Sequence, residues 1–278
     1  MHYFKEVLAS RELLANLTLR EIRGKYKRTV FGQLWSLANP LALMLIYTFV
    51  FSFIFRVPIA PGDPSGLEAF PLWLLCGLLP FTFVTNVINQ GVSSLVANSG
   101  LIQKVYFNRI VLPLSLTASA TYNWLFEMGV LLIALLIAGS FVLPWIPLLL
   151  AVMVLLTIFS AGVGLMLSIA NVYFRDTQYF VGILLQIWMY LSPVIYPVTL
   201  VKTASDDFGG LFGSSVHLID IYKLNPMEHF ITIFRNLLYD NRFPEPTEWL
   251  VCGLWALIMF ALGLVVFRRN ERNLAEAL

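Results

Sequence analysis

Long stretches of this chain contain no charged residue. Asp, Glu, Lys and Arg are absent from residues 29–55, 69–103, 177–201 and 249–267. Residues 110–171 contain a single charged side chain, Glu127. A helix of about 20 apolar residues crosses the ~30 Å hydrocarbon layer of a bilayer. The sequence therefore predicts an all-α, polytopic membrane protein.

The apolar segments divide the chain into transmembrane spans and connections. We expect six transmembrane helices near residues 37–55, 70–91, 111–139, 148–170, 177–196 and 249–267. Hydrophobic residues make up 59% of the 278 residues and charged residues 12%, which excludes an ordinary soluble domain. We expect a single transmembrane domain over residues 1–278. Its parts are an interfacial segment 1–36, spans one to five over 37–196, an outer gate segment 197–248, span six over 249–267 and a tail 268–278.

Basic residues are distributed unequally between the two sides of the predicted bundle. If the N-terminus is cytoplasmic, 13 of the 18 Lys and Arg residues fall on the cytoplasmic side and 5 fall outside. Cytoplasmic loops of membrane proteins are enriched in Lys and Arg. The distribution favours a multi-pass protein of the plasma (inner) membrane with both termini in the cytoplasm.

Two segments outside the spans have helical patterns. Residues 2–23 place apolar and basic side chains on different sides of a helix, which predicts an amphipathic helix at the membrane interface. This helix serves either as a topology anchor or in function. Residues 227–238 carry an apolar stripe but are too few to span a bilayer. We therefore expect short re-entrant outer helices between spans five and six, enclosed by protein or lining a cavity.

Five basic residues occupy nine positions just before the first span. They are Arg20, Arg23, Lys25, Lys27 and Arg28. Clustered Arg and Lys side chains neutralise and hydrogen-bond phosphate groups, so these residues are candidates for binding an anionic lipid headgroup. The alternative is that they only set the topology. After them, Asn39-Pro40 is expected to open the first span, because proline is tolerated in the first turn of a helix.

Residue patterns for enzymatic chemistry are missing from the sequence. No phosphate-binding Gly-x-x-x-x-Gly-Lys-Ser/Thr loop and no serine nucleophile motif is present. The histidines lack metal-ligand spacing, and we expect adjacent Glu228 and His229 to be a solvated pair in a loop. Cys76 and Cys252 are interpreted as unpaired residues within spans. The sequence thus predicts no catalytic residue and no metal site.

Glu127 is the one carboxylate well inside a predicted span. A charge at this depth is costly, so the side chain should face the interior of the bundle or be protonated. One interpretation makes it a polar point in a translocation path or a proton site. The other makes it a hydrogen-bond partner of Thr121, Asn123 or a neighbouring helix.

Aromatic residues are abundant, and three of them share one face of the first span. Tyr47, Phe51 and Phe55 follow one another at a spacing of four residues. Such side chains either contact lipid and form interfacial belts, or line a tunnel in which sugar rings stack on aromatic faces. The candidate lining residues are Tyr47, Phe51, Phe55, Trp73, Phe81, Glu127, Trp188 and Tyr196.

Several sequence blocks match one family in order. Residues 19–35 read Leu-Arg-Glu-Ile-Arg-Gly-Lys-Tyr-Lys-Arg-Thr-Val-Phe-Gly-Gln-Leu-Trp, and Asn39-Pro40-Leu41 follows. Later blocks are residues 98–113, Phe174-Arg175-Asp176, residues 192–197 (Ser-Pro-Val-Ile-Tyr-Pro) and Asn225-Pro226-Met227. Together they resemble the permease subunit of polysaccharide-export ABC transporters over essentially the whole chain. Asn108 departs from this family, which more often has proline there.

The resemblance implies partners and a substrate. Two copies would form a homodimeric channel and dock two copies of a separate ABC ATPase. That ATPase would bind ATP and Mg²⁺, so this chain would be a transport subunit without a cofactor of its own. The substrate would be a polyprenyl-diphosphate-linked polysaccharide such as O-antigen, teichoic acid, galactan or capsule. Membrane lipids would be the other partners, and no nucleic acid is expected.

The resemblance also implies which residues contact the ATPase. Residues 98–113 resemble the family's cytoplasmic coupling helix, and the turn at Arg175 would make a second contact. The implied coupling residues are Leu101, Ile102, Lys104, Tyr106, Phe107, Arg175 and Asp176. Two alternatives stay open. One is a drug or small-lipid exporter permease of the same superfamily, and the other, less favoured, is an intramembrane glycosyl- or phosphotransferase.

Overall fold

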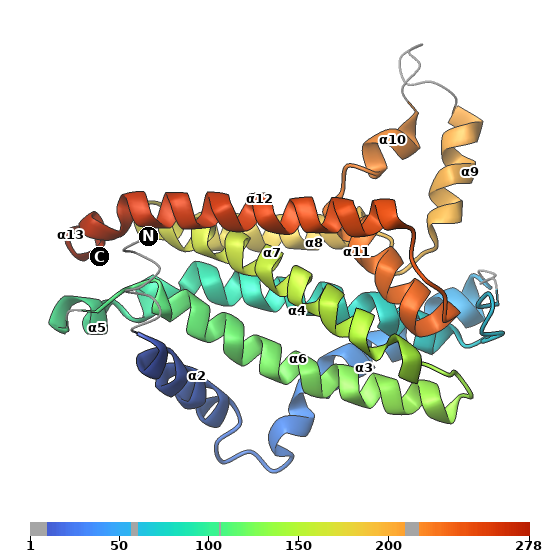
Figure 1. Ribbon diagram of the computed structural model, residues 1–278, viewed down its shortest axis with the longest axis horizontal. Coiled ribbons are helices and arrows are strands. Elements are labelled where there is room, and N and C mark those ends of the chain that lie inside the picture. The colour runs from blue at the N-terminus through green and yellow to red at the C-terminus, as the bar shows by residue number, and fades with distance from the viewer. Residues whose placement is uncertain (1–9, 57–60, 106, 209–216) are drawn as a thin grey trace.

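The computed structural model describes residues 10–56, 61–105, 107–208 and 217–278, and within them all regular structure is helical (Figure 1). Five helices have the length and apolarity of a membrane span. They are Gly32–Ile54 (η1, α3 and η2), Phe70–Ala97 (α4), Val111–Ile137 (α6), Leu143–Tyr173 (η3 and α7) and Pro246–Asn270 (α12). Each coincides with a predicted span, which confirms the all-helical membrane class.

The remaining predicted span, 177–196, is shorter than expected. Helix α8 runs over Thr177–Tyr190 and contains 14 residues, or about 21 Å. It ends before Pro193 and Pro197, which lack a backbone N–H donor and so favour a break or kink in a helix. Helix α9 then begins at Val198. A sixth crossing of the bilayer therefore stays a prediction.

Helix α4 occupies the centre of the bundle. It packs against α3, α6, α7 and α8, and it is the most buried of the five candidate spans. Glycines let the backbones approach: a Cβ atom at Gly91 would lie 2.8 Å from the Cα atom of Gly164 in α7. Helices α7 and α12 approach in the same way at Gly162 and Gly263. Small residues commonly allow such close contacts between membrane helices.

The first span differs from the prediction at its start. Helix α3 covers Trp35–Tyr47, so Pro40 lies inside the helix and is buried, whereas it was expected to open it. Proline at this position removes the hydrogen bond to the Ser36 carbonyl. The helix continues as a π-helix, η2, over Thr48–Ile54. The predicted boundary was wrong because the helix begins before Pro40. The 3-10 turn η1 (Gly32–Leu34) leads directly into the first residue of α3, Trp35.

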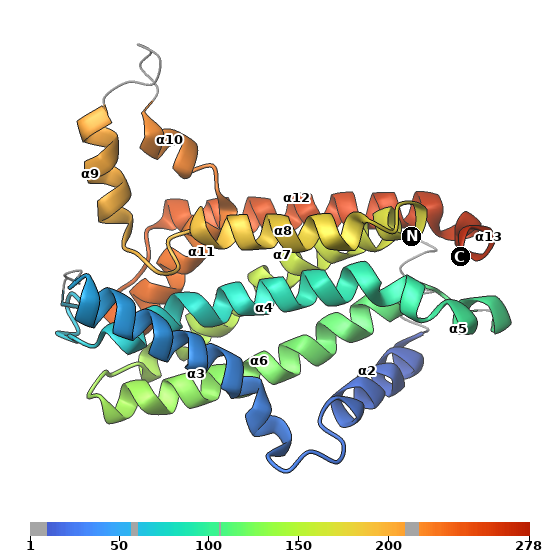
Figure 2. The same cartoon turned by 180° about the vertical axis from the view of Figure 1, so that it is seen from behind.

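Helix α2 (Arg11–Lys25) lies outside the bundle core and packs along α6 (Figures 1 and 2). Leu17 is its buried residue, in a cluster that includes Val111 and Leu112 of α6. A helix was predicted here from residue 2, but residues 2–9 lie outside the described part of the chain. Its location at a membrane interface stays a prediction.

The two ends of the bundle carry different connections. At one end lie α5 (Ser99–Lys104), the turn between α7 and α8, and the C-terminal η6 (Glu271–Asn273) and α13 (Leu274–Ala277) (Figures 1 and 2). We call this the α5 end. The opposite end, called the α11 end, contains the loop before α4, the turn between α6 and α7, and α11.

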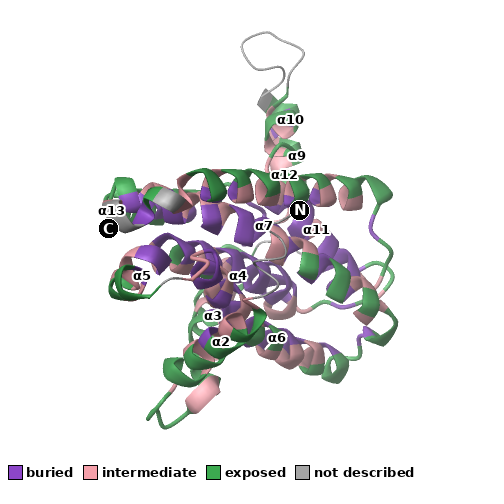
Figure 3. Cartoon of the chain, turned by 60° about the vertical axis from the view of Figure 1, so that its left-hand side comes forward, coloured by how far each residue is buried: buried purple, intermediate pink, exposed green. Residues whose placement is uncertain are grey.

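The segment between α8 and α12 has a projecting part and a buried part. Helices α9 (Val198–Phe208) and α10 (Leu218–Tyr222) project from the side of the bundle (Figures 1 and 3). Helix α11 (Pro226–Arg235) and the π-helix η5 (Asn236–Asp240) pack against α4 and α12. Most residues of α11 are buried. The predicted short helix is present, and its re-entry into the membrane stays a prediction.

Candidate functional site

Two aromatic ladders run along the end of the first span. Tyr47 and Phe51 have ring centroids 6.4 Å apart, and Phe51 and Phe55 are 5.8 Å apart. Tyr47 and Phe51 pack partly against the core, whereas Phe55 is exposed. The sequence correctly indicated that these three rings are neighbours. It did not single out a second pair, Phe49 and Phe53, which lie 6.2 Å apart and are more exposed than Tyr47 and Phe51.

Tyrosine hydroxyls continue from the first ladder toward the α11 end. The Tyr47 hydroxyl lies beside that of Tyr190 on α8. The Tyr196 hydroxyl donates to the Tyr190 carbonyl at 2.7 Å, and the Tyr222 hydroxyl donates to Tyr196 at 3.3 Å. Tyr222 also lines a cavity of about 530 Å³ together with Trp188 and Trp255. This path joins the first span, α8 and α10 through groups that can both stack and hydrogen-bond.

Three other predicted aromatic residues serve the packing of the bundle. Phe81 is 3% exposed and packs edge-on against Trp188, with centroids 6.0 Å apart. Trp188 donates from Nε1 to Asn225 Oδ1 at 2.8 Å, and Asn225 Oδ1 also accepts from the backbone N–H of Met227 at the start of α11. Trp73 is buried beneath the guanidinium of Arg235. The structure therefore groups Phe81 with Trp188.

Glu127 lies at the wall of an apolar cavity between α3, α4 and α6. The cavity has a volume of about 300 Å³, and Glu127 is the one charged residue that lines it. Lys25 lies within electrostatic range of the carboxylate, and the Ser36 hydroxyl lies beside it, outside normal hydrogen-bond geometry. Thr121 and Asn123 instead hydrogen-bond to carbonyls of their own helix. The polar groups that act on Glu127 thus come from the last residue of α2 and the first turn of α3.

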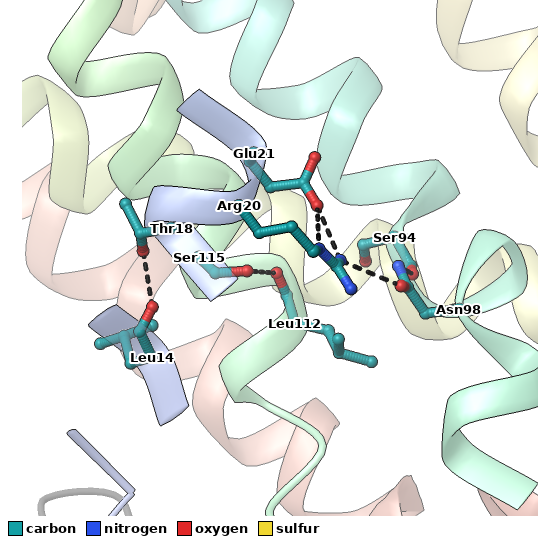
Figure 4. Close-up of polar contacts among 8 residues, drawn as sticks. All are labelled: Leu14, Thr18, Arg20, Glu21, Ser94, Asn98, Leu112 and Ser115. Carbon is teal, nitrogen blue, oxygen red and sulfur yellow. Dashed lines mark hydrogen bonds and ion pairs between the residues drawn. The ribbon is translucent and has the colours of Figure 1, made fainter. Parts of the chain in front are cut away.

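One of the five basic residues before the first span is held in place by neighbours. Arg20 binds Glu21 at 2.7 Å, and its Nη2 donates to Asn98 Oδ1 at 3.4 Å (Figure 4). Asn98 in turn donates to the Ser94 carbonyl, so α2 is attached to the end of α4. All five basic residues are exposed, and the other four are Arg23, Lys25, Lys27 and Arg28. They form a basic surface where α2 ends.

The predicted coupling residues divide into anchoring and exposed positions. Ile102 is buried in the cluster that contains Leu274, and Leu101 and Phe107 pack partly against it. Lys104 is exposed on α5. Arg175 and Asp176 are exposed at the turn between α7 and α8. Tyr106 lies outside the described residues.

The same end of the bundle has features that the sequence analysis missed. Val105 and Phe174 are exposed apolar side chains beside the predicted positions, at 52% and 70%. Arg109 ties this region to the C-terminal segment: its backbone N–H donates to Glu271 Oε1 at 3.0 Å, and its guanidinium donates to the Glu271 carbonyl. The result is an exposed apolar and charged surface on a well-anchored support.

The prediction of a solvated Glu228–His229 pair was wrong. Both residues are buried, at 5% and 8% exposure, in the first turn of α11. His229 Nδ1 lies 2.5 Å from Glu248 Oε2 in the first turn of α12, and Nε2 lies 2.7 Å from the Lys223 carbonyl. Burial opposes protonation, but the Glu248 and Lys223 hydrogen bonds and both carboxylates raise the pKa of His229. Burial raises the pKa of Glu228.

Comparison with known proteins identifies the family. Residues 12–205 match the membrane component of ABC-2 type transporters. Similar proteins include an O-antigen export system permease of Myxococcus xanthus, 26% identical over 99% of this chain and 98% of that protein. An O-antigen export permease of Klebsiella pneumoniae is 28% identical over 96% and 95% of the two chains. A polysialic acid transport protein of Escherichia coli is 26% identical over 92% of each.

The family match covers more than half of the chain, so this protein belongs to the ABC-2 type transporter membrane family. It is a transport component of the membrane, and membership implies an ABC ATPase as a separate partner subunit. The aromatic path, the basic surface of α2 and the exposed surface at the α5 end are therefore candidate transport features. None of them requires catalytic chemistry within this chain.

Proposed function

We propose that this protein is the channel-forming permease of an exporter that moves a polyprenyl-diphosphate-linked polysaccharide out of the cytoplasm. The observation that supports this proposal is the length of chain over which the protein is similar to export permeases. The family match ends at residue 205, whereas similarity to the O-antigen and polysialic acid proteins extends over nearly the full length of both chains. The similarity to glycan exporters thus includes α10, α11 and α12.

The proposed assembly contains two copies of this chain and two ABC ATPase subunits. Both termini and the α5 end face the cytoplasm, and α8 completes the sixth crossing of the inner membrane. The exposed residues at the α5 end, Lys104, Val105, Phe174 and Arg175, support docking of the ATPase there. Apolar side chains with a neighbouring charge can anchor in a groove of a soluble partner. The α11 end then faces outward.

The basic surface of α2 is the proposed recognition site for the lipid diphosphate. Arg23, Lys27 and Arg28 are exposed where the chain turns toward the first span. Guanidinium and ammonium groups form strong, charge-assisted hydrogen bonds with phosphate oxygens. Arg20 is left out of this proposal because Glu21 and Asn98 already bind its guanidinium.

The aromatic ladder is the proposed wall of the sugar path. A glycan that entered hydrocarbon alone would leave its hydroxyls without hydrogen-bond partners. Tyr47, Phe51 and Phe55 offer ring faces, and Tyr190 and Tyr196 add hydroxyls along the same route. Trp73 and Phe81 are enclosed within one copy, so we assign them to packing.

Depletion of this chain from cells tests the proposed substrate. We expect polyprenyl-linked glycan to accumulate inside, with the same result on depletion of the ABC ATPase. Normal glycan on the cell surface, together with altered drug resistance or lipid export, would overturn the proposal and support a drug or small-lipid exporter.

Substrate recognition is tested separately with the purified complex in lipid. Arg23→Gln combined with Lys27→Gln should reduce the stimulation of ATP hydrolysis by lipid-linked glycan while leaving basal hydrolysis intact. The matched control is Lys202→Gln with Arg242→Gln, which removes the same charge from the segment between α8 and α12. Equal stimulation in both double variants would contradict headgroup binding by α2.

A further inference from the structure

Two glutamates and a histidine converge where α11 meets α12. Glu228 and His229 lie in the first turn of α11, and Glu248 lies in the first turn of α12. One nitrogen or oxygen atom from each residue lies within 4.8 Å of the other two. His229 Nδ1 is 2.5 Å from Glu248 Oε2 and 3.3 Å from Glu228 Oε2. We propose that this cluster binds one divalent transition-metal ion, with Zn²⁺ as its test ion.

The second nitrogen of His229 fixes the ring in an orientation suited to a metal ligand. Nε2 lies 2.7 Å from the Lys223 carbonyl. A carbonyl only accepts hydrogen bonds, so Nε2 carries a proton and Nδ1 points to the two carboxylates. Metal-binding histidines typically donate their other N–H to a carbonyl or carboxylate in this way. The hydrogen bond that would orient His229 as a metal ligand through Nδ1 is therefore already present.

One buried oxygen of the cluster accepts no hydrogen bond. Glu228 is 5% exposed, and within the described residues its Oε2 has only the 3.3 Å ion-pair contact with His229 Nδ1, which itself faces Glu248 more closely. Thr232 reaches only the other oxygen, Oε1, at 3.5 Å. A buried carboxylate oxygen without a donor is costly. A cation coordinated between Glu228 and Glu248 would satisfy this oxygen and balance the two negative charges.

The chemistry of the nearby groups favours a transition metal over Ca²⁺ or Mg²⁺. Imidazole nitrogen suits zinc, whereas calcium and magnesium prefer oxygen ligands alone. Cys252 lies one helical turn after Glu248 on α12, is fully buried and forms no disulfide. Its thiol is within electrostatic range of both carboxylates but is not among the ligand atoms that lie within 4.8 Å of one another. Lys223 and Tyr222 also act electrostatically on Glu228.

Binding of the ion exchanges a proton for a metal. Because Nε2 carries a proton and a carboxylate only accepts, the 2.5 Å contact between His229 Nδ1 and Glu248 Oε2 requires a second proton on Nδ1. When Zn²⁺ binds, Nδ1 releases its proton to solvent, and the ligands move apart to accept an ion at about 2.0–2.2 Å from each. The ion would then hold the start of α11 against the start of α12. This inference is independent of the exported substrate.

Metal titration of the full-length, tag-free chain tests the site. After treatment with a chelator, we expect the protein to take up one Zn²⁺ per chain and to unfold at a higher temperature. His229→Asn and the double variant Glu228→Gln, Glu248→Gln should each weaken binding by at least tenfold. The control is His217→Asn, which changes an exposed histidine of the same segment and should leave binding unchanged.

Two outcomes overturn the site. One is a wild-type chain that retains no stoichiometric Zn²⁺, and the other is full binding by folded His229→Asn protein. If the cluster variants do not fold, X-ray absorption spectroscopy of the zinc-loaded wild-type protein identifies the ligands of the ion and so tests the site. One imidazole with carboxylate oxygens supports the assignment, and any shell without imidazole or with several imidazoles contradicts it.

Discussion

The guanidinium carbon of Arg235 lies 3.4 Å from the centre of the Trp73 ring. Arg235 also donates from Nη2 to the Val194 carbonyl at 2.8 Å, and its side chain is buried. One cation therefore connects α4, α11 and the turn after α8. An arginine over the face of a tryptophan is attracted by the ring quadrupole, most strongly where water is excluded.

Gly77 tests the packing around this cation. A Cβ atom there would lie 2.9 Å from Arg235 Nη2 and 3.3 Å from Ile231. Because Arg235 is fixed by Trp73 and Val194, we expect Gly77→Ala to destabilise the protein by about 1–3 kcal/mol, measured by thermal unfolding in detergent. Gly129→Ala in α6 meets open space and should be neutral or stabilising by up to about 1 kcal/mol. Equal effects of the two changes would contradict the tight packing.

The crossing of α7 and α12 should tolerate no added side chain. A Cβ atom at Gly263 would lie 2.4 Å from the Gly162 carbonyl oxygen, and one at Gly162 would lie 2.4 Å from the Met259 backbone. Backbone atoms cannot rotate away, so we expect either Gly→Ala change to cost more than about 3 kcal/mol and to lower the yield of folded protein. Gly253→Ala, on α12 but facing open space, should express normally.

Substitutions in the two aromatic ladders of the first span should affect export differently. We expect Tyr47→Leu with Phe51→Leu to reduce export of long glycan about three- to tenfold, because two stacking contacts are lost. Phe49→Leu with Phe53→Leu, at more exposed positions, should keep export near the wild-type level because leucine is equally suited to lipid. Surface glycan is compared with protein level and basal ATP hydrolysis. Loss of export in the second variant alone would place the path on the other ladder.

Substitutions at the α5 end should separate effects on binding of the ATPase from effects on the stability of the chain. Val105→Asp and Phe174→Asp should weaken co-purification of the ATPase, because each charge replaces an exposed apolar contact. Phe243→Asp is the control, since it changes an exposed apolar residue near the α11 end. Ile102→Ala should instead destabilise the chain by about 2–4 kcal/mol, because Ile102 is a buried anchor. Unaltered ATPase binding by the two aspartate variants would remove this surface from coupling.

The pKa values at α11 predict that stability falls as pH rises. The pKa of His229 is raised above 6.5, so its stabilising contribution is complete below that pH and is lost as pH rises through the folded-state pKa. The raised pKa of Glu228 acts in the same direction from 4.5 upward. With a chelator present, the unfolding temperature should decline as pH rises above about 6.5, and less steeply in His229→Asn. A flat wild-type profile would contradict these shifts.

Sequence patterns located most helices but not all of their ends. Absence of charge predicted the five long helices, because a segment that avoids charge over 20 residues has few other uses than a membrane. The start of α3 was misplaced because Pro40 signals a helix start locally, whereas the preceding turns extend the helix past it. Helix α8 is short because Pro193 and Pro197 follow it, and both prolines are visible in the sequence. Whether α8 still crosses the bilayer depends on the helices around it.

Contacts between residues far apart in the sequence were harder to predict than helices. The spacing of Tyr47, Phe51 and Phe55 correctly predicted neighbours, because the residues lie on one helix. His229 and Glu248 lie 19 residues apart on two helices, and no local pattern connects them. Their convergence depends on the turn after η5, which returns the chain so that α12 starts beside α11.

Local patterns were enough to predict the class of this protein and its helical composition, because hydrophobicity and helix periodicity are local properties of the chain. Which polar groups are buried together depends instead on how the helices pack. Arg235 stacks on Trp73, and His229 lies between Glu228 and Glu248, because close glycine contacts and the enclosed position of α11 bring distant segments together. Burial strengthens electrostatic interactions through the lower effective dielectric, so these pairings set the chemistry of the α11 end.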